Sequence, residues 1–433
     1  MRLAVARLWA GTTAAFVVLA ALLFPSFSAV PAQALHNPHE IGTLTPGDDF
    51  ADNSALSAET TVRFATFDAG LSRPSAGDLV EDLATRDDPQ ARAVAEIIQL
   101  NAPDVLVLND IDYDSAGAAV ALFKTNYLEV AENGADEARY PYTYVAAVNT
   151  GVPSGLDLNN DGRTGGRGDA FGPGAFEGQH GMAVLSKYPI ETDKIRSFQN
   201  FLWKDMPNAQ LPDDPASGRA SGWYSWMELQ KVRLSSVSHW DVPISVGEST
   251  IHALVSNPSP PPRNGLPGRY GGRNSDEIRL WSDYVSGGAK AAYLYDDDGG
   301  TGGLPRGARF VVLGDQNSDP EDGGASAGAV NQLLEHPLIT DPEPISDGAK
   351  EAAALQGGVN DFHRGDAQFD TVDREDKAAG NTRSDYVLPA RSLGVSGKGV
   401  FWPRVSTPGA ELTGIFPFPG SAHRLVYVDV IRP

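Results

Sequence analysis

The sequence predicts a sheet protein of the α/β or layered α+β class, folded as a single domain. Early in the folded region, segments of β-forming residues alternate with segments whose apolar residues recur at helical spacing. Several later segments are short, continuous apolar runs, which are typical of strands buried on both faces. No internal repeat and no clean linker follows residue 60, so one domain is the simplest interpretation.

The first elements follow the order strand, helix, strand, helix. Residues 61–67 (TVRFATF) alternate and are rich in β-forming types, so they predict a strand. Residues 88–100 begin with Asp-Pro, a common helix start, and carry apolar residues at helical spacing. Residues 104–108 (DVLVL) predict a buried strand, and residues 115–123 predict a second helix.

The remaining predicted elements are mostly strands, separated by two long loops at 149–180 and 257–274. Loops of this length inside a compact domain are usually functional or disordered. Further strands are predicted at 181–186, 227–234, 242–247, 250–256, 309–313, 384–388 and 425–430. Helices are predicted at 275–284, with Ser275 as the cap, and at 325–334, and residues 336–382 are expected to be irregular.

Composition limits the partners of this chain. Its 433 residues include 56 acidic and 34 basic ones, for a formal net charge of −22. Most of such a surface repels nucleic acid and anionic membranes. The sequence contains no cysteine, which excludes disulfides, thiolate catalysis and cysteine-based zinc sites. We therefore expect a monomer for which long nucleic acid is an unfavourable partner.

The N-terminal residues have the pattern of a targeting signal. Arg2 and Arg7 precede the mostly apolar run 8–24, and Ala32-Gln33-Ala34 is a small-residue cleavage site. Residues 1–34 are therefore predicted to be a signal peptide that is cleaved near Ala34, giving a secreted protein. A membrane anchor is the alternative, but the run is short, and no later segment is apolar enough to span a bilayer. Residues 35–60 would form an N-terminal arm, and residues 61–433 the domain.

Polar residues stand at the ends of several predicted strands. The apolar run 309–313 leads directly into Asp315 and Asn317, and other strands end or begin at Asp68, Asp110 and Asp385. His423 precedes the final strand. Converging carboxylates, an amide and an imidazole suit a hard divalent cation and an attack of water on phosphorus. The alternative is a set of ordinary turns, because Asp and Asn favour turns by themselves.

Seven segments carry a family resemblance. In order they are FATFDAGL (64–71), PDVLVLNDIDYD (103–114), GMAVLSKYPI (181–190), VSNPSPPP (255–262), LGDQNSDP (313–320), SDYVLPA (384–390) and SAHRLVYVDV (421–430). The chain thereby resembles the endonuclease/exonuclease/phosphatase, or deoxyribonuclease-I-like, superfamily, and within it the secreted bacterial branch. The resemblance implies an α+β fold, a four-layer α/β/β/α sandwich of two packed mixed β-sheets flanked by helices. It also implies a phosphoesterase that depends on Mg²⁺ or Mn²⁺.

The same resemblance implies roles for individual residues. Asp315, from the G-D-x-N motif, would handle the attacking water or the leaving group, and Asn317 would donate to the phosphate. Asp385, from S-D-Y, would orient His423 for acid–base or phosphate-contact work. The metal would lie near Asp68 and Asp110, which complete the candidate site.

Four of these motif positions depart from the family pattern. Asp68 stands in place of Asn, and Asp110 in place of Glu, one methylene shorter. Asn257 stands where a catalytic mid-chain His is expected, and Ala422 where an Asp usually precedes the terminal His. The alternative function is therefore a degenerate member that binds a phosphorylated ligand or partner with weak or no catalysis.

Three smaller signals complete the expectations. Arg263, Arg269 and Arg273 lie in a stretch poor in acids and are candidates for a clamp on the substrate phosphate, with a solubilising loop as the alternative. Asp157, Asn159 and Asp161 have the opening spacing of a calcium loop, so a structural Ca²⁺ is possible there, with a solvated turn as the alternative. His180 differs from the other histidines because it ends a long loop and could point into the cleft.

Overall fold

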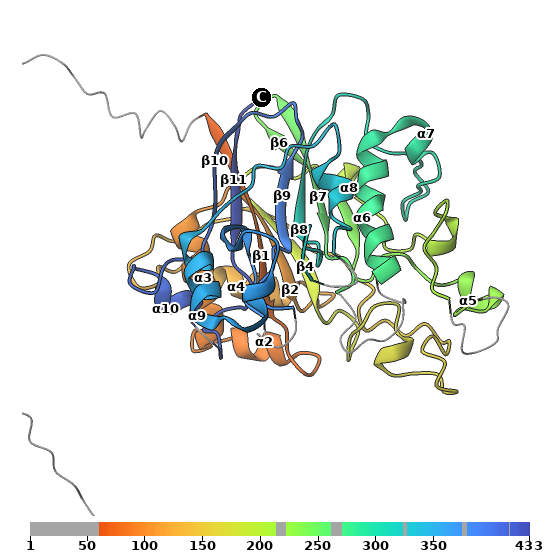
Figure 1. Ribbon diagram of the computed structural model, residues 1–433, viewed down its shortest axis with the longest axis horizontal. Helices are drawn as coiled ribbons and strands as arrows, with labels where there is room; N and C mark the ends of the chain where they lie inside the picture. Colours follow the sequence, from red (N-terminus) through yellow and green to blue (C-terminus); the bar gives the residue numbers. More distant parts are fainter. Residues whose placement is uncertain (1–59, 214–221, 261–270, 324–326, 375–378, 415) are drawn as a thin grey trace, which may run out of the picture. The chain divides into compact units, whose positions relative to one another are not determined.

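A computed structural model of the chain describes residues 60–433 except 214–221, 261–270, 324–326, 375–378 and 415 (Figure 1). All of the described residues belong to one compact unit. The predicted signal peptide and almost all of the predicted arm lie outside the described residues. No helix in the described part of the chain is long and apolar enough to cross a membrane.

Two mixed β-sheets form the centre of the molecule. The six-stranded sheet has the order β10-β11-β1-β2-β4-β3, and the five-stranded sheet has the order β5-β6-β7-β8-β9. The strands are β1 (Thr61–Leu71), β2 (Val105–Ile111), β3 (Tyr142–Tyr144), β4 (Gly181–Ser186), β5 (Arg196–Ser197), β6 (His239–Val246), β7 (Ser249–Ser256), β8 (Arg309–Asp315), β9 (Asp385–Pro389), β10 (Val395–Val400) and β11 (Val426–Ile431).

The alternation of side chains along the strands explains how the sheets are packed. In β1, Phe64 points into a core shared with the five-stranded sheet, while Phe67 points into a second core on the opposite face. Val107 and Leu108 in β2 divide in the same way. Successive strand residues face opposite sides of a sheet, so a strand that is apolar on both sides is covered on both sides.

Helices close the two outer faces. They are α2 (Asp78–Leu83), α3 (Pro89–Asn101), α4 (Ala118–Phe123), α5 (Trp226–Leu229), α6 (Gly271–Ser286), α7 (Gly288–Ala291), α8 (Asn331–Leu334), α9 (Asp347–Gln356) and α10 (Ala410–Thr413). A π-helical turn continues α4 (Lys124–Leu128), and single 3₁₀ turns lie at Arg167–Asp169, Thr192–Lys194, Trp203–Asp205, Gly358–Phe362 and Ala367–Phe369. Helix α3 packs its apolar residues in the second core, and α6 packs Ile278 and Trp281 in the core of the five-stranded sheet. The predicted four-layer sandwich is confirmed.

Local sequence signals account for the confirmed elements. Asp88 caps α3, since its carboxylate accepts the N–H of Ala91, and Pro89 occupies the first helical position. The predicted helix at 115–123 begins later, at Ala118, because the carboxylate of Asp114 accepts the N–H groups of Ala118 and Ala119. The strands predicted at 61–67, 104–108, 181–186, 242–247, 250–256, 309–313, 384–388 and 425–430 are all present, with ends shifted by up to four residues.

Four predicted segments need correction. The strand predicted at 227–234 is wrong, because Ser225 and Glu228 form a reciprocal capping box that starts helix α5 instead. Ser275 does not cap α6, which begins four residues earlier at Gly271. The helix predicted at 325–334 is reduced to α8, with 324–326 outside the described residues. The stretch 336–382 is not irregular throughout, since Ser346 caps helix α9 within it.

Strand directions bring the polar strand ends to one edge of the sandwich. β1 and β2 run parallel, with Asp68 opposite Asn109. β7 and β8 also run parallel, and the antiparallel β9 begins where β8 ends, with Asp315 opposite Asp385. β11 runs antiparallel to β1, so the segment that enters β11 lies beside the end of β1. Residues far apart in sequence therefore meet at this edge.

The edge contains irregular backbone. The β1–β2 pairing shifts register after Asp68, and the β2–β4 pairing shifts between Asn109 and Ile111. Gly314 has φ +138°, and a Cβ at this position would lie 1.9 Å from the carbonyl oxygen of Ser256. The G-D-x-N motif therefore requires its glycine, because β8 passes too close to the end of β7 for any side chain.

Candidate active site

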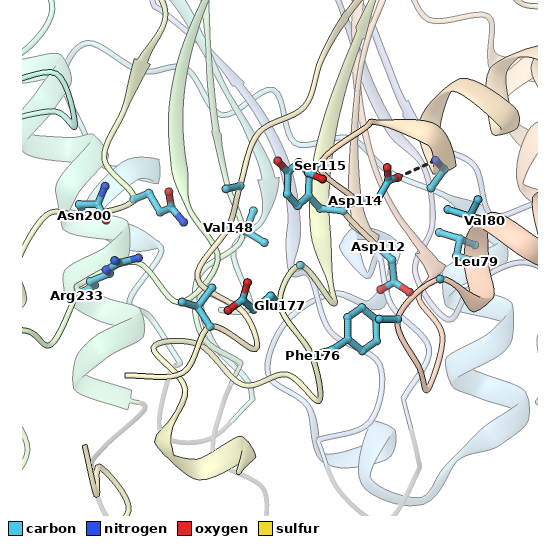
Figure 2. Close-up of a pocket in the computed structure, with 18 residues that line it drawn as sticks. Leu79, Val80, Asp112, Asp114, Ser115, Val148, Phe176, Glu177, Asn200 and Arg233 are labelled. Carbon is cyan, nitrogen blue, oxygen red and sulfur yellow. Dashed lines mark hydrogen bonds between the residues drawn. The ribbon is translucent and has the colours of Figure 1, made fainter. Parts of the chain in front are cut away.

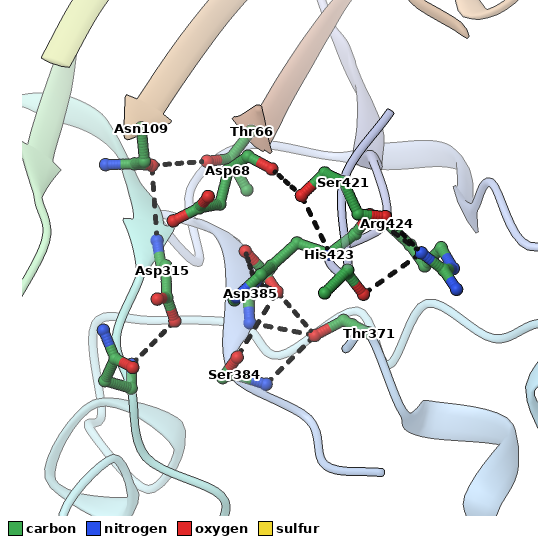
Figure 3. A network of polar contacts seen from close by, with 12 residues as sticks. Thr66, Asp68, Asn109, Asp315, Thr371, Ser384, Asp385, Ser421, His423 and Arg424 are labelled. Carbon is green, nitrogen blue, oxygen red and sulfur yellow. Dashed lines mark hydrogen bonds and ion pairs between the residues drawn. The ribbon is translucent and has the colours of Figure 1, made fainter. Parts of the chain in front are cut away.

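Three predicted residues form a group with the geometry of a metal site. Asp68 in β1, Asp315 at the end of β8 and His423 before β11 each offer one ligand atom, and these atoms all lie within 4.8 Å of one another (Figure 3). The two aspartates are buried, at 7% and 2% exposed. It is the one such group of acidic and histidine residues in the described ranges.

Asp385 holds the imidazole of His423. His423 Nδ1 lies 2.9 Å from Asp385 Oδ2 and 3.2 Å from Oδ1, and Asp385 is fully buried. The hydroxyl of Thr371 donates to Asp385 Oδ2 at 2.8 Å, which fixes the carboxylate from its other side. The predicted Asp385–His423 pair is thus present as a contact, with the second ring nitrogen directed away from the carboxylate.

Ser421 ties the histidine segment to the end of β1. Its hydroxyl donates to the carbonyl oxygen of Asp68 at 2.7 Å and accepts the backbone N–H of His423 at 3.0 Å. Ala422, where the family pattern has an aspartate, contributes only its backbone here, since its carbonyl accepts the N–H of Asp373. The hydroxyl of Ser421, rather than a second carboxylate, therefore sets the position of His423 relative to Asp68.

The electrostatics of this group favour a cation close to its carboxylates. Burial raises the pKa of Asp68 well above its usual range, and Asp110, Asp315 and Asp385 raise it further, against the lowering effect of His423. Burial and Asp385 likewise raise the pKa of Asp315 to about 6. Buried carboxylates this close resist ionisation unless a cation lies among them. The donor set, two carboxylates at a buried edge, therefore fits a hard divalent cation.

His423 carries the positive charge that the group does contain. Burial lowers the pKa of His423, but the carboxylates of Asp385, Asp68 and Asp315 outweigh this and raise it to about 10. A protonated ring donates from both nitrogens, so the nitrogen not used by Asp385 can donate to an anionic oxygen. The ring thus has one nitrogen directed at Asp385 and a second that can serve as a donor.

The predicted amide residues lie next to this group. The N–H of Asn317 donates to Asp315 Oδ1 at 2.8 Å. The side-chain amide of Asn317 donates to Asn257 Oδ1 and to the carbonyl oxygen of Pro258, both at 3.2 Å. Asn317 has φ +50°, an uncommon conformation for a residue other than glycine, which turns its side chain back toward the end of β7. The structure thus brings Asn257, Asn317 and Asp315 together.

Asp110 lies outside the metal-type group. Its Oδ1 lies 2.5 Å from Nδ1 of His180, at the start of β4. Asp110 raises the pKa of Asp68, so the two carboxylates are within electrostatic reach, but Asp110 shares no ligand position with Asp68 and Asp315. The assignment of Asp110 as a metal ligand alongside Asp68 stays a prediction.

Of the predicted arginine clamp, only Arg273 lies within the described residues. It is 3% exposed, and its Nε and Nη2 donate to the carbonyl oxygens of Leu234, Phe171, Arg233 and Ser235. These bonds anchor the start of α6 to neighbouring loops, and a role of Arg273 in substrate binding stays a prediction. Arg263 and Arg269 lie outside the described residues.

The residues of the predicted calcium loop form a turn. Asp157 accepts the N–H groups of Asp161 and Gly162, and Asp161 accepts the N–H of Arg163. The amide of Asn159 donates to Asp161 Oδ2, and its Oδ1 accepts the N–H of Asp161. These are the hydrogen bonds of a turn, and a structural Ca²⁺ at this turn stays a prediction.

Asn109 is a site residue that the sequence prediction missed. It is fully buried, and its Oδ1 accepts from the hydroxyl of Thr66 and from the N–H of Asp315, at 3.3 Å and 3.4 Å. It therefore links the two sheets at the site (Figure 3). Its side-chain nitrogen is buried without a partner among the described residues. The available signal was its place directly after the apolar run of β2.

A cavity of about 490 Å³ lies to one side of this edge (Figure 2). Its walls include the apolar or aromatic residues Leu79, Val80, Tyr113, Val148 and Phe176, and the charged residues Asp114, Glu177 and Arg233. Asp112 also lines it, and one oxygen of Asp112 accepts the N–H of His180 at 3.2 Å. The cavity is therefore next to the Asp110–His180 pair and does not contain the Asp68–Asp315–His423 group.

One family model and several solved structures are similar to this chain. The model of the Endonuclease/Exonuclease/phosphatase family matches residues 72–423. Similar solved structures include an endonuclease/exonuclease/phosphatase from Beutenbergia cavernae DSM 12333, with 15% identity over 86% of this chain and 72% of that one (TM-score 0.44). TDP2 from C. elegans shows 13% identity over 88% and 80% (TM-score 0.41), and sphingomyelinase C from Streptomyces griseocarneus 16% over 85% and 99% (TM-score 0.39). The sequence has no significant match among curated proteins.

Proposed function

We propose, from the premise that this chain belongs to the endonuclease/exonuclease/phosphatase family, that it is a secreted phosphoesterase that requires a divalent metal. Members of that family are metal-dependent hydrolases of phosphoesters. The observation that carries the proposal is the gathering of Asp68, Asp315, Asp385 and His423 from four separate segments into one buried group.

The metal would be held by the carboxylates of Asp68 and Asp315, and we propose Mg²⁺ or Mn²⁺. Both are oxygen-preferring cations, and both tolerate sites with few protein ligands completed by water. When bound, such a cation neutralises phosphoryl oxygens and stabilises the charge that develops during hydrolysis. Its charge would also allow the two buried carboxylates, whose pKa values are raised, to ionise together.

The protein residues would divide the remaining work. Asp315, with one oxygen fixed by the N–H of Asn317, would orient the attacking water and accept its proton. His423, held by Asp385, would donate to a phosphoryl oxygen or to the leaving oxygen. Asn317 and Asn257 would position the phosphoryl group from the end of β7, with a neutral amide where a histidine is usual.

A small phosphorylated substrate, including a phospholipid headgroup, suits the chain better than long nucleic acid. The net charge of −22 repels a polyanion at long range, whereas one phosphate meets only the local charges of the site. The cavity beside Asp112 offers apolar walls for the part of the substrate that carries no phosphate. Both phosphomonoesters and phosphodiesters remain candidates.

Export is part of the same proposal. The N-terminal pattern of Arg2, Arg7, the apolar run 8–24 and the Ala-x-Ala site supports cleavage near Ala34. The mass of the protein recovered from the culture medium should correspond to a chain that starts at Leu35. Recovery only from cells, with residues 1–34 retained, would contradict this part.

Hydrolysis of simple esters tests the proposed function. Purified protein is assayed with p-nitrophenyl phosphate and bis(p-nitrophenyl) phosphate, with Mg²⁺, Mn²⁺ or Ca²⁺, before and after treatment with a chelator. We expect turnover that the chelator abolishes and that Mg²⁺ or Mn²⁺ restores. Asp68→Asn should raise the metal concentration needed for half-maximal rate. Absence of turnover with every metal and both esters would refute the proposal.

The second candidate is a binding protein with weak or no catalysis. The observation in its favour is that Asp110, at the family's metal-binding Glu position, is engaged by His180, while Ala422 adds no ligand oxygen. The triple change Asp110→Glu, Asn257→His and Ala422→Asp restores the family pattern. A large gain in rate would favour the binding protein, and an unchanged rate would exclude it.

A further inference from the structure

A second histidine–carboxylate pair lies at the same edge as the candidate active site. His180 Nδ1 contacts Asp110 Oδ1 at 2.5 Å. Asp110 lies in β2 and His180 directly before β4, whereas the Asp385–His423 pair comes from β9 and the segment before β11. The two pairs therefore approach the edge from different elements.

The backbone at both members of this pair is unusual. Asp110 has φ +53° and His180 has φ +55°, and the pairing of β2 with β4 shifts register between Asn109 and Ile111, on either side of Asp110. Left-handed backbone at residues other than glycine costs of order 1–3 kcal/mol and persists where the surrounding structure enforces it. The contact between the two side chains thus coincides with two left-handed residues.

His180 has a free ring nitrogen. Nδ1 is used by Asp110, and the backbone N–H of His180 donates to Asp112, but Nε2 has no hydrogen-bond partner among the described residues. The side chain of His180 is 39% exposed, compared with 14% for His423. The ring is therefore oriented by a carboxylate on one side and open to a ligand on the other.

A second imidazole would add to His423 in holding a phosphoryl group at this edge. A phosphoryl group that enters the edge meets the carboxylates of Asp68, Asp315 and Asp385, and the positive charges that act on Asp315 there are those of His423 and Arg374. Burial lowers the pKa of His180, but the hydrogen bond and charge of Asp110, with Asp112 and Asp68, raise it above its ordinary value. The contact with Asp110 orients the ring, and its exposure leaves Nε2 available as a donor.

We propose that His180 binds the phosphoryl group of the substrate through Nε2, with Asp110 as its positioning residue. Asn257, at the end of β7, is a neutral amide and cannot bind the phosphate as a cation. His180, directly before β4, would do so instead. This inference rests on the proposed function for its substrate class. It assigns Asp110 an indirect role and links the phosphate position to the neighbouring cavity through Asp112.

Binding of inorganic phosphate tests the inference without turnover. Phosphate affinity in the presence of Mg²⁺ is measured by calorimetry for the wild type, His180→Ala and His180→Gln. Loss of a charged hydrogen bond should weaken phosphate binding roughly ten- to a hundredfold in both variants. The control is His252→Ala. His252 lies in β7, five residues before Asn257, and forms a similar pair at 2.7 Å with Asp241 in β6.

Kinetics with p-nitrophenyl phosphate give a second readout. We expect His180→Ala to raise KM by a factor similar to the loss in phosphate affinity, with a smaller change in kcat, while His252→Ala changes neither. Thermal unfolding shows whether each variant is folded. Unchanged phosphate affinity in folded His180→Ala, or no phosphate binding by the wild type, would overturn the inference.

The two proposals can fail separately. A wild type that binds phosphate in a His180-dependent way without hydrolysing either ester would refute the proposed hydrolysis and support the assignment of His180. A wild type that hydrolyses the esters with KM values unaffected by His180→Ala would support hydrolysis and refute the assignment.

Discussion

Replacing Asp385 by Asn isolates the contribution of the charge behind His423. Asparagine has nearly the same shape, so the buried position and the contact with Thr371 can be kept. The pKa of His423 is raised to about 10 because its neighbouring carboxylates outweigh burial, and Asp385 is the largest of them. Without that charge, burial favours the neutral ring, and its donor to the phosphoryl group is lost. Removing one such stabilising group typically lowers kcat on the order of a hundred- to a thousandfold.

The assay is metal-dependent hydrolysis of p-nitrophenyl phosphate, with thermal unfolding measured on the same samples. Asp241→Asn is the matched control, because Asp241 forms the other buried histidine pair of the five-stranded sheet, with His252. Both variants should lose some stability, and only Asp385→Asn should lose most of kcat. Equal kcat values for Asp385→Asn and the wild type would refute the assignment of His423 as a charged catalytic group.

Two further predictions concern stability. Gly314→Ala should lower the free energy of unfolding by about 2–6 kcal/mol, from backbone strain plus the clash with Ser256, whereas Gly247→Ala, with φ +63° and no atom within 4 Å, should cost only the strain. Urea denaturation measures both, and equal losses would contradict the steric argument. Burial lowers the pKa of His239 to about 4, so protonation of this ring favours the unfolded chain. The free energy of unfolding should therefore fall by about 3 kcal/mol relative to His239→Gln as pH drops from about 6.5 to about 4. Parallel stability curves for the two proteins over that range would contradict it.

Strand positions were the most predictable feature of this chain. The apolar runs that form β2, β4 and β8 are long enough, and bounded sharply enough by polar residues, to identify buried strands. The residues at their ends could then be proposed as a site, because an acidic or amide residue directly after a buried strand has a fixed place at the sheet edge. For Asp68, Asp315, Asp385 and His423, the structure shows this convergence.

Weak strands and local capping were not predictable in the same way. β10 (VSGKGV) is glycine-containing and half exposed, so its pairing with β11 supplies an order that its own composition does not indicate. The segment that includes α5 has apolar residues compatible with a strand, and only the capping box of Ser225 and Glu228 decides for a helix. Such choices depend on single hydrogen bonds rather than on periodicity.

Side-chain partners were the least predictable. Nothing in the linear sequence distinguishes Arg273, which turns inward to backbone carbonyl oxygens, from an arginine that faces solvent. Asp110 was placed correctly at the edge, but its partner His180 is 70 residues away, and their contact coincides with two left-handed backbone positions. The pattern of residue types gives the composition of the edge, and the folded backbone decides which residue touches which.

The division of the site between the two sheets has a further consequence. Asp68 belongs to the six-stranded sheet, and Asp315 and Asp385 to the five-stranded one, so the ligand distances depend on how β1 faces β8 and β9. Substitutions deep in the intervening layer, at Phe64 or Val312 for example, could detune hydrolysis while leaving every polar side chain in place. The rate of hydrolysis would then report on the alignment of the two sheets. It would fall at temperatures where spectroscopic signals of secondary structure are still intact.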